Sequence, residues 1–124
     1  MCAKAAAVLA LAVLLLGAAA PPAAYVDTGI AHVPLGITSW CWDARCGAPL
    51  GSTGRRVLVT RGTPVRVELK FEPVAVTVNV AGGRVKPMAH GREVTWTATR
   101  AGGLTVNVKY LRGWVIYSAR LALR

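Results

Sequence analysis

Five stretches of this chain alternate apolar and polar side chains with a period of two, and this pattern constrains the fold more than any other feature. The stretches cover residues 65–71, 74–80, 93–98, 104–110 and 115–124. A period of two is typical of β-strands with one buried face, and the Val and Thr that abound here favour such strands. No stretch after residue 25 shows a comparable helical period, so we predict an all-β fold.

The segments between these stretches carry the signals of tight turns and of one crossing. Gly82-Gly83, Gly91-Arg92, Gly102-Gly103 and Arg112-Gly113 each separate two strands, as hairpin turns do. Glu72-Pro73 has no glycine, and proline lacks the N–H of a tight hairpin, so we expect the chain to cross between two sheets there. We predict an antiparallel, immunoglobulin-like β-sandwich of about seven strands, with a small closed β-barrel as the alternative.

The first two dozen residues have the composition of a secretory signal. Lys4 precedes an uncharged apolar run, Ala5 to Ala20, and Pro21-Pro22 ends any helix. We expect residues 1–24 to form a signal helix that is cleaved; the alternative is an uncleaved anchor, for which the run is short. Residues 25–56 then form an extended N-terminal segment with a disulfide loop, and residues 57–124 form the main sandwich strands.

Two cysteines, Cys41 and Cys46, remain in the chain after the signal, and export would place them in an oxidising compartment. Outside the cytosol a pair this close forms a disulfide, so we predict a structural disulfide here. The spacing is not the C-x-x-C of thiol oxidoreductases, and a metal site would need both His32 and His90. A redox centre and a metal site remain the alternatives.

Tryptophans flank the first cysteine, which makes this loop a candidate binding surface. We expect the two to face opposite sides of an extended stretch, one in the core and the other over the loop, where it could stack on a ligand. A short loop tied by a disulfide also loses little conformational freedom on binding, as in rigid inhibitor loops. The candidate residues are Trp40, Trp42, Asp43 and Arg45.

Several motifs occur in a fixed order along the chain: Ser-aromatic-Cys-Trp at 39–42, Cys46, Gly-x-x-Val-x-Val at 62–67, Phe71 before Pro73, and GWVIYSARLAL at 113–123. In this order they resemble a group of small exported bacterial proteins with an immunoglobulin-like sandwich, often lipoproteins, whose function is uncharacterised. The resemblance implies the fold and an extracytoplasmic location, and it implies no activity. This chain departs from the group because no cysteine lies directly after its apolar run to carry a lipid.

The charge is strongly basic, with 15 Lys and Arg against 5 Asp and Glu and a net charge of +10. A cytosolic protein with this balance often binds nucleic acid, but an exported one meets other polyanions, such as anionic headgroups and acidic envelope polymers. The alternative is a solvated sheet face whose charges discourage pairing between strand edges. The candidate polyanion face consists of bases at outward positions: Arg66, Lys70, Lys109, Arg120 and Arg124.

No motif indicates catalysis. Gly51-Ser52-Thr53-Gly54 has neither the G-x-S-x-G pattern of a serine hydrolase nor the lysine of a phosphate-binding loop. No serine or cysteine is spaced from a histidine as a nucleophile and its base would be. We therefore expect no enzyme and no cofactor. The alternative is a copper or zinc site whose ligands are Met88, His90 and His32.

Three hypotheses for function follow. The first is a non-catalytic, secreted or cell-envelope binding or accessory module, whose partner is a protein or an anionic envelope polymer and not nucleic acid. The second is a secreted inhibitor or structural protein that uses the loop at 41–49, and the third is a copper- or zinc-binding domain. We expect contact with a membrane only through an uncleaved signal anchor.

Overall fold

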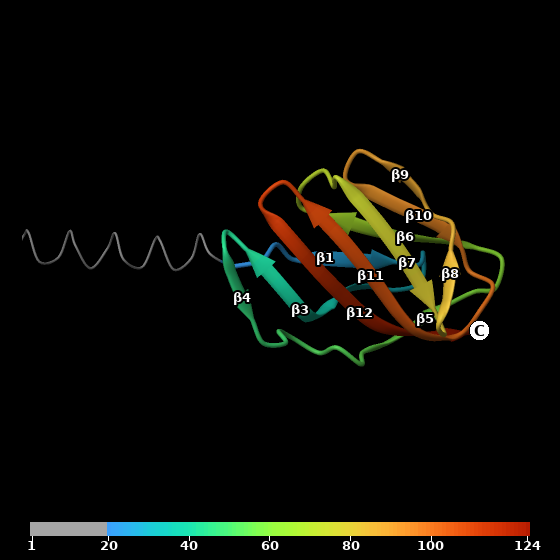
Figure 1. Cartoon of the computed structure of the whole chain (residues 1–124). Coiled ribbons are helices and arrows are strands. Elements are labelled where there is room, and N and C mark those ends of the chain that lie inside the picture. The colour runs from blue at the N-terminus through green and yellow to red at the C-terminus, as the bar shows by residue number, and fades with distance from the viewer. Residues whose placement is uncertain (1–19) are drawn as a thin grey trace, which may run out of the picture.

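The computed structural model describes residues 20–124, which form two β-sheets packed face to face (Figure 1). The predicted signal helix lies outside the described residues, apart from the short stretch at 20–24. Within residues 20–124, no helix is long and apolar enough to cross a membrane. The prediction of an all-β sandwich is confirmed. The strands form two separate sheets with free edges, so the alternative, a closed barrel, is wrong.

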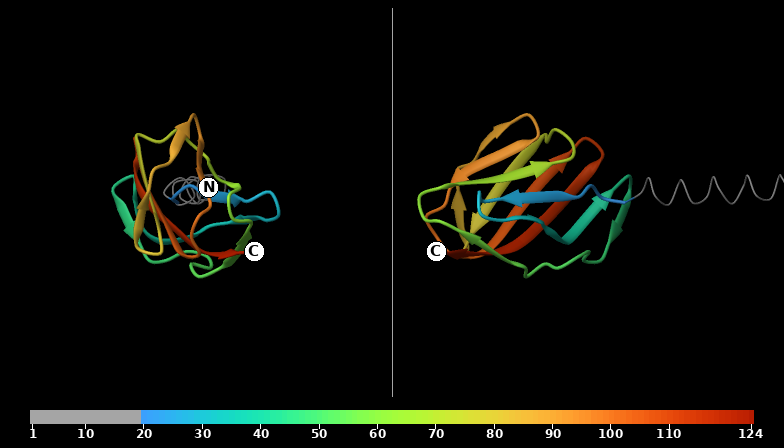
Figure 2. Two further views of the ribbon diagram at one scale, coloured as in Figure 1. Left: turned by 90° about the vertical axis from the view of Figure 1, so that its right-hand side faces the viewer. Right: turned by 180° about the vertical axis from the view of Figure 1, so that it is seen from behind.

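The small sheet has five antiparallel strands, in the order β2-β1-β6-β10-β9. It lies in front when the sandwich is seen from behind (Figure 2). The short strands β2 and β9 form its two edges. Its strands are β1 (Ala24–Asp27), β2 (His32–Pro34), β6 (Pro64–Leu69), β9 (Met88–His90) and β10 (Glu93–Thr97).

The large sheet has the order β4-β3-β12-β11-β7-β8. Its longest strand, β12, pairs with β3 through its first half and with β5 through its second half. The β5–β12 pair is parallel, which the predicted antiparallel topology did not include. Its strands are β3 (Gly36–Trp42), β4 (Arg45–Gly47), β5 (Arg56–Val59), β7 (Ala75–Val80), β8 (Gly83–Val85), β11 (Gly102–Tyr110) and β12 (Gly113–Leu123).

The core lies between the sheets and is built from the inward half of each alternating stretch. In the small sheet, Val67 lies between Val26 and Val94 in register, and all three are fully buried. In the large sheet, Val106 lies between Val78 and Tyr117 in the same way. Among the described residues, the buried core cluster runs from Ala24 to Leu121, and buried Pro22 lies just before it, so residues 20–124 contain a complete core.

The crossing predicted at Glu72-Pro73 is confirmed, because β6 belongs to the small sheet and β7 to the large one. The hairpins predicted around Gly82, Gly91 and Arg112 also form. The hairpin predicted at Gly102-Gly103 is wrong: both glycines lie in β11, and the chain crosses between the sheets just before them. The chain crosses five times rather than once, so neighbours in the sequence often lie in different sheets.

The strand count also exceeds the prediction, with twelve strands in place of about seven. Residues 25–56, expected as an extended segment, contribute β1 to β4 and the first residue of β5. These strands are inside the sheets, since β1 lies between β2 and β6, and β3 lies between β4 and β12. Several of the additional strands are only three or four residues long, too short for alternation to reveal them.

Candidate functional site: the outer face of the large sheet

The disulfide closes the hairpin of β3 and β4. Cys41 and Cys46 face each other in register, with Cα atoms 4.0 Å apart and their sulfur atoms bonded. Asp43 and Ala44 form the turn, with φ of 50° and 63°. Two successive positive φ values characterise the type I′ turn, whose twist matches a two-stranded ribbon. The predicted disulfide is confirmed, and such bonds are typical of proteins exposed to oxidising conditions.

The two tryptophans of this hairpin lie on the same side of β3, so the expectation of opposite sides is wrong. Side chains two positions apart share a face, and the pairing of Trp40 with buried Val115 turns that face inward. Trp42 is buried, whereas Trp40 is half-buried beside the core. The Trp40 Nε1–H donates to the Ala48 carbonyl at 3.0 Å, and the ring covers Gly47. Both rings are therefore engaged within the fold.

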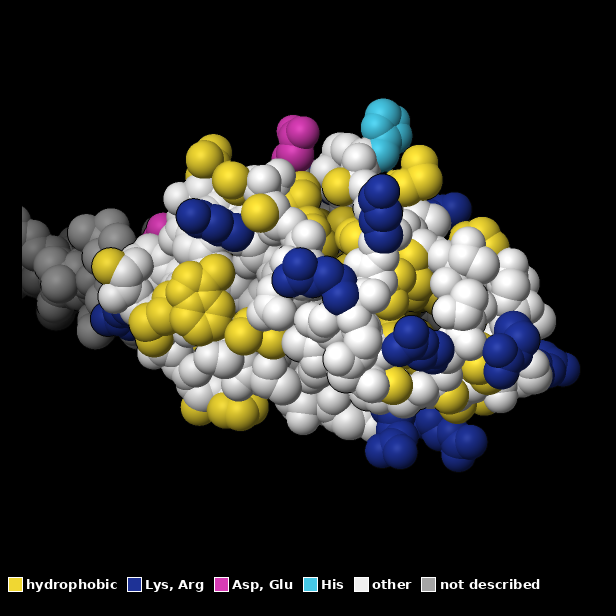
Figure 3. All heavy atoms as spheres, turned by 45° about the vertical axis from the view of Figure 1, so that its right-hand side comes forward, with side chains coloured by type: hydrophobic (Ala, Val, Ile, Leu, Met, Phe, Trp, Pro, Cys, Tyr) yellow, Lys and Arg dark blue, Asp and Glu magenta, His cyan; other side chains and the backbone are white. Residues whose placement is uncertain are grey.

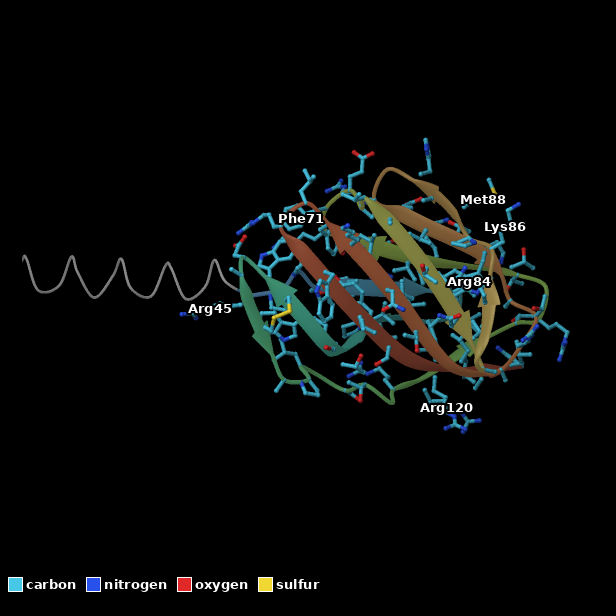
Figure 4. The ribbon with its side chains drawn as sticks, viewed as in Figure 1. Arg45, Phe71, Arg84, Lys86, Met88 and Arg120 are labelled. Carbon is cyan, nitrogen blue, oxygen red and sulfur yellow. A yellow bond between two sulfur atoms is a disulfide. The ribbon has the colours of Figure 1, made fainter. Side chains whose placement is uncertain are left out.

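The remaining charged residues of the predicted loop surface differ in their roles. Arg112, in the β11–β12 turn, holds the Asp43 carboxylate with both Nε and Nη2, and its Nε lies 2.9 Å from Oδ1. The same guanidinium lies 5.0 Å from the centre of the Trp42 ring. This ion pair lowers the pKa of Asp43 and raises the pKa of Arg112. Asp43 is exposed but ion-paired, whereas Arg45 projects into solvent (Figure 4).

The five bases predicted to form a polyanion face are all exposed, but they do not share one face. Arg66 lies in β6 and Lys70 directly follows it, so both belong to the small sheet. Lys109 lies in β11 and Arg120 in β12, with Arg124 after the end of β12, so these three belong to the large sheet. Alternation identifies an outward position, but it leaves open which of the two sheets carries it.

Charge is segregated between the two sheets. The strands of the small sheet contain three of the five acidic residues, Asp27, Glu68 and Glu93, and one base, Arg66. The strands of the large sheet contain no Asp or Glu, and their five bases are Arg45, Arg56, Arg84, Lys109 and Arg120. Figure 3 shows basic side chains spread across this side of the molecule, with acidic ones only at its margins. The excess positive charge therefore lies toward the large sheet.

Cross-strand pairing arranges the outward side chains of the large sheet in three adjacent rows. The first row is Cys46, Cys41, Trp114, Lys109 and Ala75. The second is Ser39, Ile116, Asn107 and Thr77. The third is Ser118, Thr105, Asn79 and Arg84. An exposed indole thus lies between the disulfide and a lysine, next to a field of amides and hydroxyls.

This face is hollowed rather than flat. One shallow hollow is lined by side chains from β7, β11 and β12, and Trp114 and Lys109 are among them. A second, lined by Arg84 and Lys86, shares Thr77 with the first. Trp114 keeps 40% of its surface exposed in spite of its size. The two hollows form a continuous outer surface from the exposed indole to Arg84 of β8 and Lys86 just after it, which we call the large-sheet face.

The residues of the alternative metal site do not come together. His32 lies on β2, while Met88 and His90 lie on β9, and these strands are the opposite edges of the small sheet. Met88 is 78% exposed and points away from the sheet (Figure 4). The copper or zinc site predicted from these three residues is therefore wrong, because the strand order separates its ligands.

His32 instead lies between two carboxylates on the small sheet. Its Nδ1 is 3.5 Å from Asp27 Oδ2, its Nε2 is 3.9 Å from Glu68 Oε2, and its ring stacks on Tyr25. The Gly29 N–H, which donates to Asp27 Oδ1 at 2.8 Å, lowers the pKa of Asp27, and His32 adds to this effect. Ligand atoms of Asp27, His32 and Glu68 lie within 4.8 Å of one another, but each ring nitrogen faces a different acid. This is the geometry of a polar cluster in which one imidazole lies between two carboxylates.

The main residues of the large-sheet face, Trp114, Asn107 and Arg84, are not among the site residues predicted from the sequence. Trp114 and Asn107 are outward positions of alternating strands, which is a signal that the sequence does contain. Their assembly depends on the register of four strands, which alternation does not determine. Comparison with known protein families, with curated proteins and with solved structures finds no match.

Proposed function

We propose that this protein is a non-catalytic, extracytoplasmic binding module, and that its large-sheet face binds an acidic polysaccharide of the cell envelope. The disulfide and the apolar N-terminal run of the sequence support this location. The resemblance to small exported immunoglobulin-like proteins points the same way. The observation that carries the proposal is the combination of segregated positive charge with an exposed tryptophan on one sheet.

The chemistry of the face matches that of a charged sugar polymer. An indole ring offers a broad apolar surface on which the C–H face of a sugar ring can stack. The amides of Asn107 and Asn79 and the hydroxyls of Thr77 and Thr105 supply both donors and acceptors for sugar hydroxyls. Lys109 and Arg84 can pair with carboxylates, and guanidinium–carboxylate pairs form strong, oriented hydrogen bonds.

The dimensions and the charge of the face favour a polymer. Three strand-to-strand spacings and two rows separate Trp114 on β12 from Arg84 on β8, a diagonal span of about 20 Å. A basic surface of this length attracts a polyanion through many weak contacts, which salt then screens. Its strands contain no carboxylate, so the paired acids that cleave glycosidic bonds are missing from them. Binding without hydrolysis fits this composition.

Titration with alginate, a carboxylate-bearing polysaccharide, tests the proposal, and neutral dextran serves as its control. We expect alginate to bind and quench tryptophan fluorescence, with an affinity that falls as salt rises, and dextran to bind far more weakly. Trp114→Ala should weaken alginate binding roughly tenfold, because a stacked ring contributes on the order of 1 kcal/mol or more. Met88→Ala, which removes an exposed side chain from the small sheet, should leave binding unchanged. Equal binding of dextran, or no effect of Trp114→Ala, would contradict the proposal.

A further inference from the structure

Four chain connections meet at one end of the sandwich, and together they expose apolar side chains there. They are the links at 43–44, 70–74, 91–92 and 111–112. Leu111 is 93% exposed, Val74 57% and Phe71 41%, and the Val74 N–H donates to the Lys109 carbonyl beside the β11–β12 turn. Figure 4 shows Phe71 and Arg45 at this end. We call this surface the turn end.

The apolar side chains of the turn end rest on a rigid base. The Phe71 ring stacks on Trp42 at 6.0 Å between centroids and meets the edge of Tyr110 at 6.4 Å. Trp42 and Tyr110 are buried, so Phe71 is held in place while part of its ring remains in water. Leu111, in the two-residue turn between β11 and β12, adds an apolar side chain that the fold itself does not use.

Basic residues surround these side chains. Arg45, Lys70 and Arg92 are exposed at this end, and Arg112 neutralises Asp43 through their ion pair. Glu72 is the other acid in the four links, and Glu93, directly after Arg92, is 3.9 Å from the Nε of Arg66 on β6. Exposed apolar side chains within a basic rim are the composition of surfaces that enter the headgroup region of an anionic bilayer, where each base adds about 1 kcal/mol of attraction.

The chain also enters the sandwich at this end. Pro22 is buried, and its carbonyl accepts a hydrogen bond of 2.7 Å from Tyr117, so the chain is fixed there. Pro22 lies only two positions after Ala20, where the apolar run of the sequence ends, and two steps along the chain span at most about 7 Å. A chain whose apolar run enters a bilayer must therefore hold the turn end against the headgroups. The C-terminus lies at the opposite end (Figure 1).

We infer that the turn end is a membrane-docking surface, with Leu111, Phe71 and Val74 inserted among the headgroups of an anionic bilayer. This orientation leaves the large-sheet face exposed at the side of the sandwich, where it can meet a polymer. The inference does not depend on the polysaccharide proposal, because different side chains make the two contacts.

Fluorophore labelling of the full chain tests this docking. Leu111→Cys, with Cys2→Ser to leave one free thiol, carries the label at the turn end; Ile30→Cys carries it in the β1–β2 turn at the far end, where Ile30 is 48% exposed. In vesicles of phosphatidylglycerol and phosphatidylcholine with brominated acyl chains, we expect strong quenching at position 111 and none at 30. Equal quenching at both positions, or none at 111, would overturn the inference and would be the result if this end binds a protein instead.

A second measurement uses the chain from Ala20 onward, which contains the complete core. Leu111→Ser should lower its partition onto the same vesicles roughly tenfold, because it removes one inserted leucine. Ile30→Ser is the matched control and should leave partition unchanged, and both variants should retain alginate binding. An unchanged partition of Leu111→Ser would contradict the docking, whereas a loss of alginate binding alone would concern only the large-sheet face.

Discussion

The hydroxyl of Tyr117 donates a hydrogen bond of 2.7 Å to the carbonyl of Pro22, a residue 95 positions earlier in the chain. Because that O–H is committed to Pro22, the Tyr110 hydroxyl, 2.9 Å away, must be the donor to Tyr117. Both rings are buried between the sheets. This relay ties the first described residues to the longest hairpin and fixes where the chain enters the sandwich.

Tyr117→Phe should lower the free energy of unfolding by about 1–3 kcal/mol, because it leaves the Pro22 carbonyl and the Tyr110 hydroxyl without their buried partner. Chemical denaturation measures this loss. Tyr110→Phe is the control and should cost less, about 1 kcal/mol, since Tyr117 can still donate to Pro22. A smaller loss for Tyr117→Phe than for Tyr110→Phe would contradict the direction of the relay.

The same pair should make the fold sensitive to alkali. Burial raises the pKa of both Tyr110 and Tyr117 above the ordinary value of about 10. A raised pKa in the folded state gives stability that is complete below pH 10 and is lost as the pH rises toward the folded-state pKa. We expect unfolding free energies measured from pH 8 to 12 to fall above pH 10, by up to about 1.4 kcal/mol per pH unit for each tyrosine. Tyr117→Phe should have the shallower slope, and a flat profile up to pH 12 would argue against burial of these hydroxyls.

Close packing between β3 and β12 predicts a severe effect of Gly113→Ala. A Cβ at this position would lie 2.0 Å from the Cys41 carbonyl oxygen, which belongs to the neighbouring strand. The clash involves backbone that has to move, so we expect a loss of about 1–3 kcal/mol in thermal or chemical unfolding. Gly103→Ala on the partner strand meets no atom within 4 Å and should be neutral or slightly stabilising. Equal losses of stability in the two variants would show that β3 and β12 do not pack closely at Gly113.

The disulfide should contribute modestly to stability. The bond between Cys41 and Cys46 closes a loop of six residues, for which chain entropy predicts about 2 kcal/mol. We therefore expect a reductant to lower the free energy of unfolding by that amount, and the double variant Cys41→Ser/Cys46→Ser to match the reduced protein. A reductant that also destabilised the double variant would show that its effect on stability does not come from this disulfide.

The sequence predicts the strands whose alternation is long enough to be visible. β6, β7, β10, β11 and β12 all follow the expected pattern, and Pro73 marks a true crossing between sheets. β2, β4, β8 and β9 have three residues each, and no periodicity can be seen in three residues. The register of these short strands depends on tertiary pairing, which lies outside the reach of local pattern.

The candidate site was less predictable than the fold. The disulfide and the outward positions of Lys109 and Arg120 followed from spacing and alternation. The prediction that Arg66 shares a face with Lys109 and Arg120 is wrong, because two outward residues can point in opposite directions when their strands lie in different sheets. Burial of one of the two tryptophans is predicted correctly, but the sequence leaves open which one, since the packing of Trp42 against Phe71 and Tyr110 depends on connections far apart in the sequence.

The most direct test of the central claim is the affinity for alginate of two double variants that change the net charge equally on different faces. Lys109→Gln/Arg84→Gln removes two charges from the large-sheet face, and Arg66→Gln/Lys70→Gln removes two from the small sheet. Isothermal titration at low salt should show at least tenfold weaker binding for the first variant and little change for the second. Equal losses would mean that net charge alone governs binding, and no loss in either variant would mean that the large-sheet face is not the binding site.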